Sequence, residues 1–459
     1  MSSAGVALSP RRLLRFETRK ETTAVRRTRR SHERRLLVMV LGIPLAWFLG
    51  LGEFMWLLLV LPMVGFMVRR RRITAPRLFW FWLLTLVLVA VAAFMLENSN
   101  QLATYLLRSS HLLSATVVFL YVFNTSEEEL PARSVLLVLA CYWGVIAVGG
   151  FLGLILGDVN LPSLAARLLP QSVVANDWIK EITTPGFAET APFMSTTIYR
   201  PKTFFNWTNE WGATYALLVP AAIAARFNLA RGKWRQILTV LLPASLIPFT
   251  FSLNRGAWMA LGVAAVYLAS RFWHGRGARL GRTIIISLLV VGALALSTPL
   301  GRVFNERLET PHSNSSRMAL YEETWERAQD RLWLGHATPR PSVDPFVPRL
   351  GTHNLYLNFM FINGLPAAFL VTSFLVSLLW VSRRLLTPVE IVVHVTVVIF
   401  MVEAIVYHLI PHPLIMLMAM GGLVARGIGS RHQLVLAGGS RDRLKPRMGE
   451  RRRPGRRAR

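Results

Sequence analysis

The sequence predicts an all-α, polytopic integral membrane protein with about 12 transmembrane helices and a large extracytoplasmic loop that contains short helices. Hydrophobic residues make up 53% of the 459 residues, charged residues make up only 17%, and the mean hydropathy is +0.42. Soluble domains usually contain about 25% charged residues, so this composition excludes an ordinary soluble fold of this length. Apolar runs close to the roughly 20 residues that cross a bilayer also recur along the chain.

Each apolar run is interpreted as one membrane helix, with boundaries set to within several residues. The predicted spans are residues 36–51, 54–68, 78–96, 103–124, 135–156, 211–226, 236–253, 256–272, 283–299, 353–381, 389–409 and 413–427. The first two meet at Gly50-Leu-Gly-Glu53, which fits a tight hairpin or, alternatively, one long tilted helix.

The distribution of charge predicts the orientation. The formal net charge of +28 would suit a nucleic-acid-binding protein if the basic residues formed a patch on a soluble domain. Most of them instead lie in the two tails and in alternate connections between spans, as the positive-inside rule requires of cytoplasmic segments. We therefore expect a multi-pass protein with both termini cytoplasmic and with no nucleic-acid partner.

The chain divides into three parts. Residues 1–35 and 428–459 are Arg-rich and predict basic cytoplasmic tails, and residues 36–427 form the membrane domain. Within that domain the connections 157–210 and 300–352 are long, and the alternation of spans puts both outside. Loops of this length usually carry a function, so we expect them to fold as a cap over the membrane part.

The second long connection contains a helical pattern. Residues 315–333 predict an amphipathic helix, because Tyr321, Trp325, Ala328 and Leu332 share a face opposite the acidic residues. Arg317, four residues before Tyr321, lies on the packed face.

Four residues that are far apart in sequence fall at the predicted outer surface, namely Arg200, Arg255, Arg317 and His353. Any one of the arginines is explained by snorkelling of its side chain to the membrane interface. Arg255, however, interrupts apolar runs on the side where cations are not favoured, and a central arginine costs roughly 2.5–3.5 kcal/mol. Guanidinium groups match phosphate oxygens, so the three arginines predict a bound phosphate or pyrophosphate. A soluble nucleotide is not indicated, because neither a Walker loop nor a dinucleotide glycine fingerprint is present.

His353 begins the predicted span 353–381, with Asn354, Tyr356 and Asn358 in its first turns. A lone histidine is more often a structural hydrogen-bonding group than a catalyst, although histidine is the commonest general base. Both interpretations stay open from spacing alone.

Other ionisable residues lie within or near the spans. Arg108 and Glu403 both lie in outer halves of predicted helices, where a structural ion pair is favoured over a proton relay. His408 and His412 flank Pro411 and could line an acceptor site. Two histidines without a third ligand do not predict a metal site.

The residues carry a family resemblance. His353-Asn-Leu-Tyr-Leu357, followed by Asn363-Gly364 and Pro366-Ala367, resembles the His-Asn-x-Tyr-Leu region of the O-antigen ligase and polymerase family. Residues 200–212 resemble that family's segment of Arg, aromatic, Asn and Gly residues, and Asn254-Arg-Gly-Ala-Trp258 resembles its Ser-Arg-Gly-Ala-Trp segment. Thr208, Asn254, Asn363 and Ala367 depart from the residues usual in these motifs, which leaves the acceptor open.

The resemblance implies a glycosyltransferase of the bacterial plasma membrane that needs neither a metal nor another cofactor. Such an enzyme moves a glycan from a polyprenyl-diphosphate carrier to a hydroxyl of a glycan, lipid or protein acceptor on the outer face. Carried over to this chain, it implies that His353 takes the acceptor proton and that Arg200, Arg255 and Arg317 hold the diphosphate. By the same resemblance, Asn209, Asn354 and Tyr356 contact substrate.

Two other classes of protein remain possible from the sequence. A transporter or flippase of a lipid-linked glycan would bind the diphosphate through the same arginines without cleaving it. A membrane scaffold with basic tails would need none of these side chains for chemistry.

Overall fold

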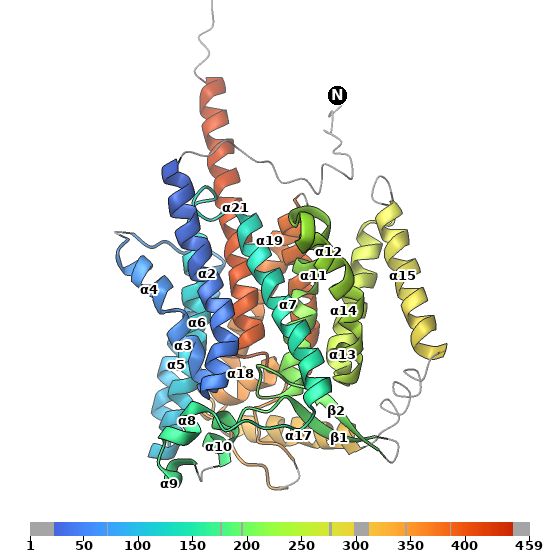
Figure 1. Ribbon diagram of the computed structural model, residues 1–459. Coiled ribbons are helices and arrows are strands. Elements are labelled where there is room, and N and C mark those ends of the chain that lie inside the picture. Colours follow the sequence, from blue (N-terminus) through green and yellow to red (C-terminus); the bar gives the residue numbers. More distant parts are fainter. Residues whose placement is uncertain are drawn as a thin grey trace, which may run out of the picture.

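The structure, a computed structural model, describes residues 23–70, 72–174, 177–193, 196–274, 278–297, 312–344, 347–385 and 387–443. These residues are mostly helical and form a bundle with one small sheet at one end (Figure 1). Residues 1–22 and 444–459, which make up much of the two predicted tails, lie outside the described residues, as does part of the predicted outer loop, 298–311.

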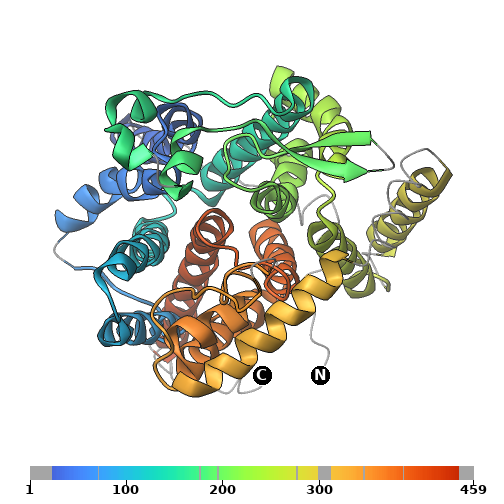
Figure 2. The ribbon, with the colours of Figure 1, turned by 90° about the horizontal axis from the view of Figure 1, so that it is seen from below.

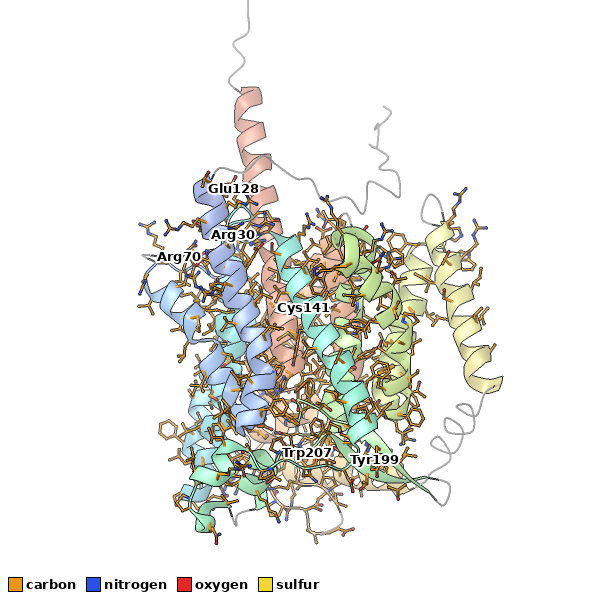
Figure 3. The ribbon with its side chains drawn as sticks, in the orientation of Figure 1. Arg30, Arg70, Glu128, Cys141, Tyr199 and Trp207 are labelled. Atoms are coloured by element: carbon orange, nitrogen blue, oxygen red, sulfur yellow. The ribbon has the colours of Figure 1, made fainter. Side chains whose placement is uncertain are left out.

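The bundle has two different ends. The start of α2 (Thr23–Leu49) and the end of α21 (His412–Arg443) lie at one end of the bundle. The described parts of the two long connections lie at the other end (Figure 1). Figure 3 marks the first end with Arg30, Arg70 and Glu128, and the second with Tyr199 and Trp207. We call the second end the loop end. The described parts of the two long connections therefore share one end of the bundle, and the side of a membrane that each end faces stays a prediction.

The remaining helices of the bundle lie between α2 and α21 in the chain. Before the first long connection come η1 (Gly52–Phe54), α3 (Met55–Leu59), α4 (Leu61–Val68), α5 (Phe79–Ala92), η2 (Ala93–Met95), α6 (Ser99–Asn124) and α7 (Ala132–Leu156). After it come α11 (Thr208–Ala224), a π-helical turn (Ala225–Leu229), α12 (Gly232–Ala244), α13 (Leu246–Phe251), α14 (Arg255–Arg271) and α15 (Ala278–Ser297). The last group holds α18 (Leu355–Asn363), α19 (Leu365–Ser382) and α20 (Pro388–Glu403).

The long connections supply further elements. The first contains the short helices α8 (Leu164–Leu168), α9 (Gln171–Val174) and α10 (Asp177–Thr183), then β1 (Ala188–Phe193) and β2 (Thr196–Pro201). These strands pair antiparallel with Glu189 opposite Arg200, so the all-α prediction is wrong at this hairpin. Threonine, isoleucine and tyrosine in β2 favour extended backbone, and the hydropathy of a segment does not reveal this preference.

Four helical segments of the described chain are long and apolar enough to cross a membrane. They are Gln101–Asn124, Ala132–Leu156, Thr208–Leu229 and Leu365–Ser382. The other predicted runs also contain helix, but within the described residues they are shorter, interrupted or more charged. Twelve crossings therefore remain a prediction.

The predicted helix 353–381 is wrong as a single element, because it breaks at Gly364 into α18 and α19. Gly364 has a φ of 87°, and a Cβ atom there would lie 2.0 Å from the carbonyl oxygen of Trp333. The loop after α17 packs into this break, where the Leu365 amide donates to the Leu332 carbonyl over 2.8 Å. Only glycine permits both this backbone conformation and this approach.

The predicted amphipathic helix is confirmed as α17 (His312–Ala328), which continues into η5 (Gln329–Arg331). Its packed face is displaced from the prediction, because Leu320, Thr324 and Ala328 are buried while Trp325 is 52% exposed. Figure 2 shows α17, in amber, lying across the loop end of the bundle. Arg317 is half-buried on this helix.

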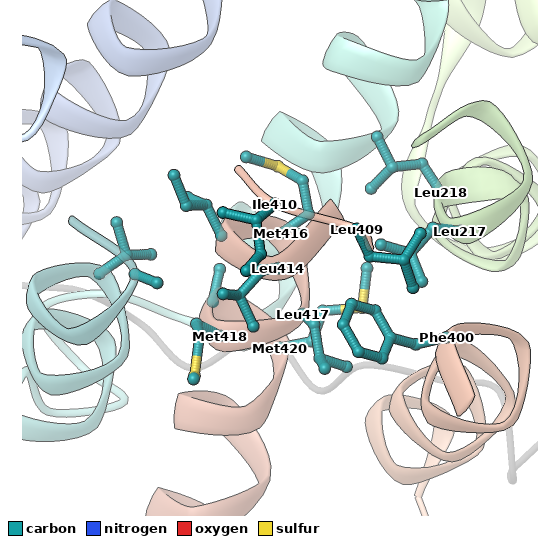
Figure 4. Packing of buried hydrophobic residues seen from close by; sticks show 14 of the residues in the cluster. Leu217, Leu218, Phe400, Leu409, Ile410, Leu414, Met416, Leu417, Met418 and Met420 are labelled. Carbon is teal, nitrogen blue, oxygen red and sulfur yellow. The ribbon is translucent and has the colours of Figure 1, made fainter. Parts of the chain in front are cut away.

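The core lies around the first half of α21. Leu414, Met416 and Leu417 belong to one cluster of buried residues with Phe400 of α20 and Leu217 of α11 (Figure 4). Small residues bring α21 against α6, since a Cβ atom on Gly422 would lie 2.8 Å from the carbonyl oxygen of Phe119. The tightly packed α21 therefore holds the start of that helix, His412, in a fixed place at the loop end.

Candidate functional site

Tyr407, in the connection between α20 and α21, joins several elements at the loop end. Its hydroxyl donates to the Asn254 side-chain oxygen and accepts from the Gly256 amide over 3.2 Å. The Arg317 guanidinium lies over its ring, 5.8 Å from the centroid. Burial raises the pKa of Tyr407, which keeps the hydroxyl protonated as a donor. One side chain thus links α14, α17 and the α20–α21 connection.

Asn254 fixes the start of α14. Its side-chain oxygen caps the helix by accepting from the Ala257 amide over 3.0 Å, and its side-chain nitrogen donates to the Asn209 carbonyl over 2.9 Å. Asn254, which departs from the family motif, therefore stabilises the start of α14 and its contact with α11. A Cβ atom on Gly256 would lie 2.6 Å from the Tyr407 ring, which explains the glycine beside Arg255.

Arg200 reaches the same place from strand β2. Its Nε donates to the Ser252 carbonyl over 2.9 Å, and its two terminal nitrogens contact Glu189 at 3.5 Å and the Asn209 side-chain oxygen at 3.4 Å. The side chain is 12% exposed. Burial lowers the pKa of Arg200 and the facing Glu189 raises it, but an arginine stays charged in this setting.

Arg200, Arg255 and His353 all lie near Arg317. The charge of Arg317 acts on Arg200, on Arg255 and on His353. Since these four residues come from β2, α14, α17 and the turn before α18, the tertiary structure brings together what the sequence only predicted to converge. We call Arg200, Arg255, Arg317, His353 and Tyr407 the arginine region.

His353 lies in the turn before α18, outside the helices of membrane-spanning length. Its Nδ1 is 3.1 Å from the Thr352 hydroxyl oxygen, and that hydroxyl donates to the Arg349 carbonyl over 2.6 Å. Because the Thr352 proton is used on Arg349, Nδ1 must carry the proton between the two residues, and Nε2 has the lone pair. Burial, and then the charge of Arg317, lower the pKa of His353 to about 4. The imidazole is therefore neutral near pH 7.

Asn354 and Tyr356 have structural partners beside His353. The Asn354 side-chain oxygen caps α18 by accepting from the amides of Tyr356 and Leu357 at 3.0 and 3.1 Å. The Tyr356 hydroxyl donates to the Met401 carbonyl of α20 over 3.3 Å. These contacts hold the turn that carries His353.

A second group of polar residues adjoins the arginine region, and sequence reasoning missed most of it. The Asn206 side chain donates to the Glu53 carboxylate over 3.1 Å, and Glu53 interacts electrostatically with both Arg108 and Glu210. We call Glu53, Arg108, Asn206, Glu210 and His408 the carboxyl region. Asn206 and Glu210 lie inside the motif segment 200–212, and this position was the only sign in the sequence that they belong to the site.

The predicted ion pair between Arg108 and Glu403 is wrong. Arg108 instead donates to the Asn358 side-chain oxygen over 2.8 Å and lies near Glu53. Glu403 is fully buried, and its carboxylate oxygens accept no hydrogen bond within the described residues. The position of Arg108 on its helix did not identify its partner, because the turn between α2 and α3 brings Glu53 to α6.

His412 lies at the edge of the carboxyl region. Its Nε2 is 3.7 Å from a Glu210 carboxylate oxygen, and its Nδ1 is 3.0 Å from the Tyr142 hydroxyl. His408 interacts electrostatically with both His353 and Arg108. Across the part of the chain that the structure describes, no group of three His, Cys, Asp or Glu residues has a metal-binding arrangement.

Fold and site together define a helical membrane protein that gathers cations beside a neutral histidine under a cap of loops. Residues 238–372 match the family model described as O-antigen ligase. This match covers Arg255, Arg317 and His353, and it confirms the resemblance to the O-antigen ligase and polymerase family over the segments 254–258 and 353–367. The motif segment 200–212 lies outside the match. It indicates a membrane enzyme of glycan transfer that takes part in polysaccharide biosynthesis. A comparison with curated proteins gives no match.

Proposed function

We propose that this protein transfers a glycan from a polyprenyl-diphosphate carrier to an acceptor hydroxyl at the outer face of the bacterial plasma membrane. The observation that carries the proposal is the arginine region, where Arg317 lies over the Tyr407 ring, Arg200 and Arg255 interact electrostatically with Tyr407, and Arg317 also acts on a neutral imidazole. A diphosphate is the anion that such a set fits, because guanidinium groups bind phosphate oxygens through paired hydrogen bonds.

The arginines bind and stabilise the leaving group. Arg200 is already held by Glu189, Asn209 and the Ser252 carbonyl, so it needs little reorganisation when substrate binds. Cations fixed in a site shielded from water stabilise the charge that develops on the diphosphate as the sugar leaves. This supply of positive charge is the reason to propose transfer without a metal.

His353 acts as the general base. Its Nε2 accepts the proton of the acceptor hydroxyl while the acceptor oxygen forms a bond to the anomeric carbon of the donor glycan. The bond from that carbon to the phosphate oxygen breaks, and its electron pair leaves with the carrier diphosphate. The products are the lengthened acceptor, the carrier diphosphate and a protonated His353, so atoms and charge balance.

Asn209, Asn354 and Tyr356 remain in the proposed site and contribute through position. Asn209 contacts both Arg200 and Asn254, while Asn354 and Tyr356 hold the turn of His353 against α18 and α20. A shift of about 1 Å in such supporting groups can lower a rate about 100-fold.

The test is His353→Ala in the full chain, purified into lipid nanodiscs and supplied with lipid-linked glycan extracted from the producing cells. Release of carrier diphosphate should fall about 100- to 10,000-fold while donor binding is retained, because loss of a general base removes that much rate. His274→Ala is the matched control, since His274 is exposed beyond the far end of α14.

The outcomes separate the three classes of protein. A His353→Ala variant that retains full transfer contradicts the assigned base. A wild-type protein that binds and moves the donor but never releases carrier diphosphate is a transporter. If Arg255→Ala and Arg317→Ala change only expression, the protein is a scaffold.

A further inference from the structure

Trp207, the residue before α11, exposes a large apolar side chain in a segment that is otherwise packed. Its exposed fraction is 51%, whereas Phe205, Thr208 and Trp211 are at most 2% exposed. Residues 201–222 are all described, and Trp207 is the only exposed residue among them. Figure 3 shows it at the loop end. Single apolar residues are common on protein surfaces, so exposure alone does not indicate a site, and the surroundings of Trp207 must do so.

The backbone on both sides of Trp207 is held in place. The Thr208 amide donates to a Glu189 carboxylate oxygen over 2.8 Å, and the Thr208 hydroxyl donates to the carbonyl of the last residue of β2 over 2.8 Å. On the other side, the Asn206 side chain donates to Glu53 over 3.1 Å. The indole ring therefore projects from a fixed backbone, and a ligand that packs on it has little ordering to bring about.

The indole ring has no polar or aromatic partner of its own within the described residues. Its Nε1–H donates to none of them, and none of their rings or guanidinium groups packs on it. A tryptophan ring combines an apolar face with one N–H donor, so it suits a ligand with the same combination. A sugar ring is such a ligand, because the carbon-bound hydrogens of one face meet the negative π surface and a hydroxyl oxygen at its edge can accept from the indole.

One carboxylate joins the backbone beside Trp207 to the arginine region. Glu189 accepts from the Thr208 amide through one oxygen and contacts Arg200 through the other, at 3.5 Å. The side-chain oxygen of Asn209, two residues after Trp207, is 3.4 Å from Arg200. In a polyprenyl-diphosphate donor the first sugar is bonded directly to the diphosphate. A diphosphate held by Arg200 would therefore bring that sugar to the neighbourhood of Trp207.

The aromatic belt at a membrane surface is the other common place for an exposed tryptophan. The surroundings of α11 do not suit that place. The segment Thr208–Leu229 is the most buried of the four candidate spans, at 67%, and α11 contacts α7, α14, α20 and α21. A helix enclosed by four others presents the residue before its first turn to the loop end and not to lipid.

We propose that Trp207 packs on the sugar that is bonded to the diphosphate of the donor, and that this sugar is a six-membered ring with one apolar face. This proposal rests on the proposed function. The arginines bind the diphosphate and the indole packs on the adjoining sugar, so the two contacts together orient the bond that breaks. Trp207 is thus a specificity-determining residue of the donor site.

The test compares equilibrium binding of two probes to the full chain in lipid nanodiscs, without acceptor. The first probe is the lipid-linked glycan extracted from the producing cells, and the second is farnesyl diphosphate, which has the diphosphate but no sugar. Trp207→Ala should weaken binding of the lipid-linked glycan about 10- to 100-fold, as expected for a tryptophan that anchors an interface, and leave binding of farnesyl diphosphate within about twofold. Trp207→Phe keeps an aromatic face and should weaken glycan binding less than about fivefold.

Trp325→Ala is the matched control, because Trp325 is 52% exposed on α17 at the same end of the bundle (Figure 2). It should bind both probes as the wild type does. Unchanged binding of the lipid-linked glycan by Trp207→Ala overturns the proposal. Equal losses of glycan binding in Trp207→Ala and Trp325→Ala overturn it as well.

Farnesyl diphosphate also reports whether the variants fold. If Trp207→Ala binds neither probe, Trp207→Leu takes its place with the same expected result, since leucine fills space without an aromatic face. Loss of both probes in Trp207→Leu overturns the proposal, because Trp207 then supports the fold and not the sugar. The proposed function fails differently, through wild-type protein that binds the lipid-linked glycan and never releases carrier diphosphate, and the effect of Trp207 on glycan binding is measured independently of that release.

Discussion

The arginine region and the carboxyl region lie side by side at the loop end and differ in charge. The first holds three arginines around a protonated phenol, and the second holds two carboxyl groups, an amide and histidines with a single arginine. A leaving diphosphate gains negative charge and needs cations, whereas a hydroxyl nucleophile needs hydrogen-bond acceptors and a base. The difference teaches that neighbouring groups of polar side chains at one end of the bundle can differ in charge, with His353 interacting electrostatically with members of both groups.

Removing an arginine from the arginine region should have the largest effect on kcat. Arg317→Ala should lower kcat about 100- to 1,000-fold, because Arg317 acts on the other two arginines and on His353 and its loss removes a fixed donor from the leaving group. Arg317→Lys should restore only part of the rate, since lysine cannot form a bidentate contact. Carrier release from purified protein measures both, with Arg327→Ala on the same helix as control. Equal activity of the Arg317→Ala variant and wild type would remove Arg317 from the site.

Changing the tautomer of His353 should have a smaller effect on kcat. Thr352→Val removes the oxygen that accepts from Nδ1, so the proton is free to occupy Nε2 and block the base. We expect kcat to fall about 10-fold, with donor and acceptor KM values nearly unchanged, consistent with loss of one hydrogen bond.

Thr352→Ser keeps the hydroxyl group and serves as the matched control, with near-normal kcat expected. If the valine and serine variants have the same kcat, Thr352 does not set the tautomer.

The pH dependence should show the smallest effect. A histidine with an ordinary pKa near 6.5 would be mostly protonated at pH 6, and the rate would fall severalfold between pH 8 and pH 6. The pKa of His353 is lowered to about 4, so the free enzyme keeps a neutral base over this range and loses it only as the pH falls toward 4. We expect kcat/KM for the donor to stay flat from pH 8 to pH 6.

The same pH profile tests the effect of Arg317 on His353. Because Arg317 lowers the pKa of His353, residual activity of Arg317→Ala should have its acidic limb at higher pH than wild type. An acidic limb near pH 6.5 in the wild-type protein would contradict a shielded, neutral His353.

Four members of the arginine region could be predicted because each has a local signal, whereas Tyr407 had none. Arg255 stands out between apolar runs, Arg317 lies in an amphipathic pattern and His353 lies in a motif. The signals for the carboxyl region were weaker, since Asn206 and Glu210 lie in the motif segment 200–212 but nothing in the sequence pairs them with Glu53. Glu53 lies in a short hairpin and Glu210 in a helix start, and each gains its meaning only from partners that are more than 50 residues away.

The sequence by itself determined that the protein is a helical membrane protein and which family it resembles, because hydropathy and motifs are local properties. The tertiary structure decided that α18 and α19 break at Gly364, that a β-hairpin delivers Arg200 and that Tyr407 joins Asn254 to Arg317. It also decided that Arg108 lies near Glu53 and not Glu403. These features depend on backbone conformation and on contacts between distant residues, which no local pattern encodes.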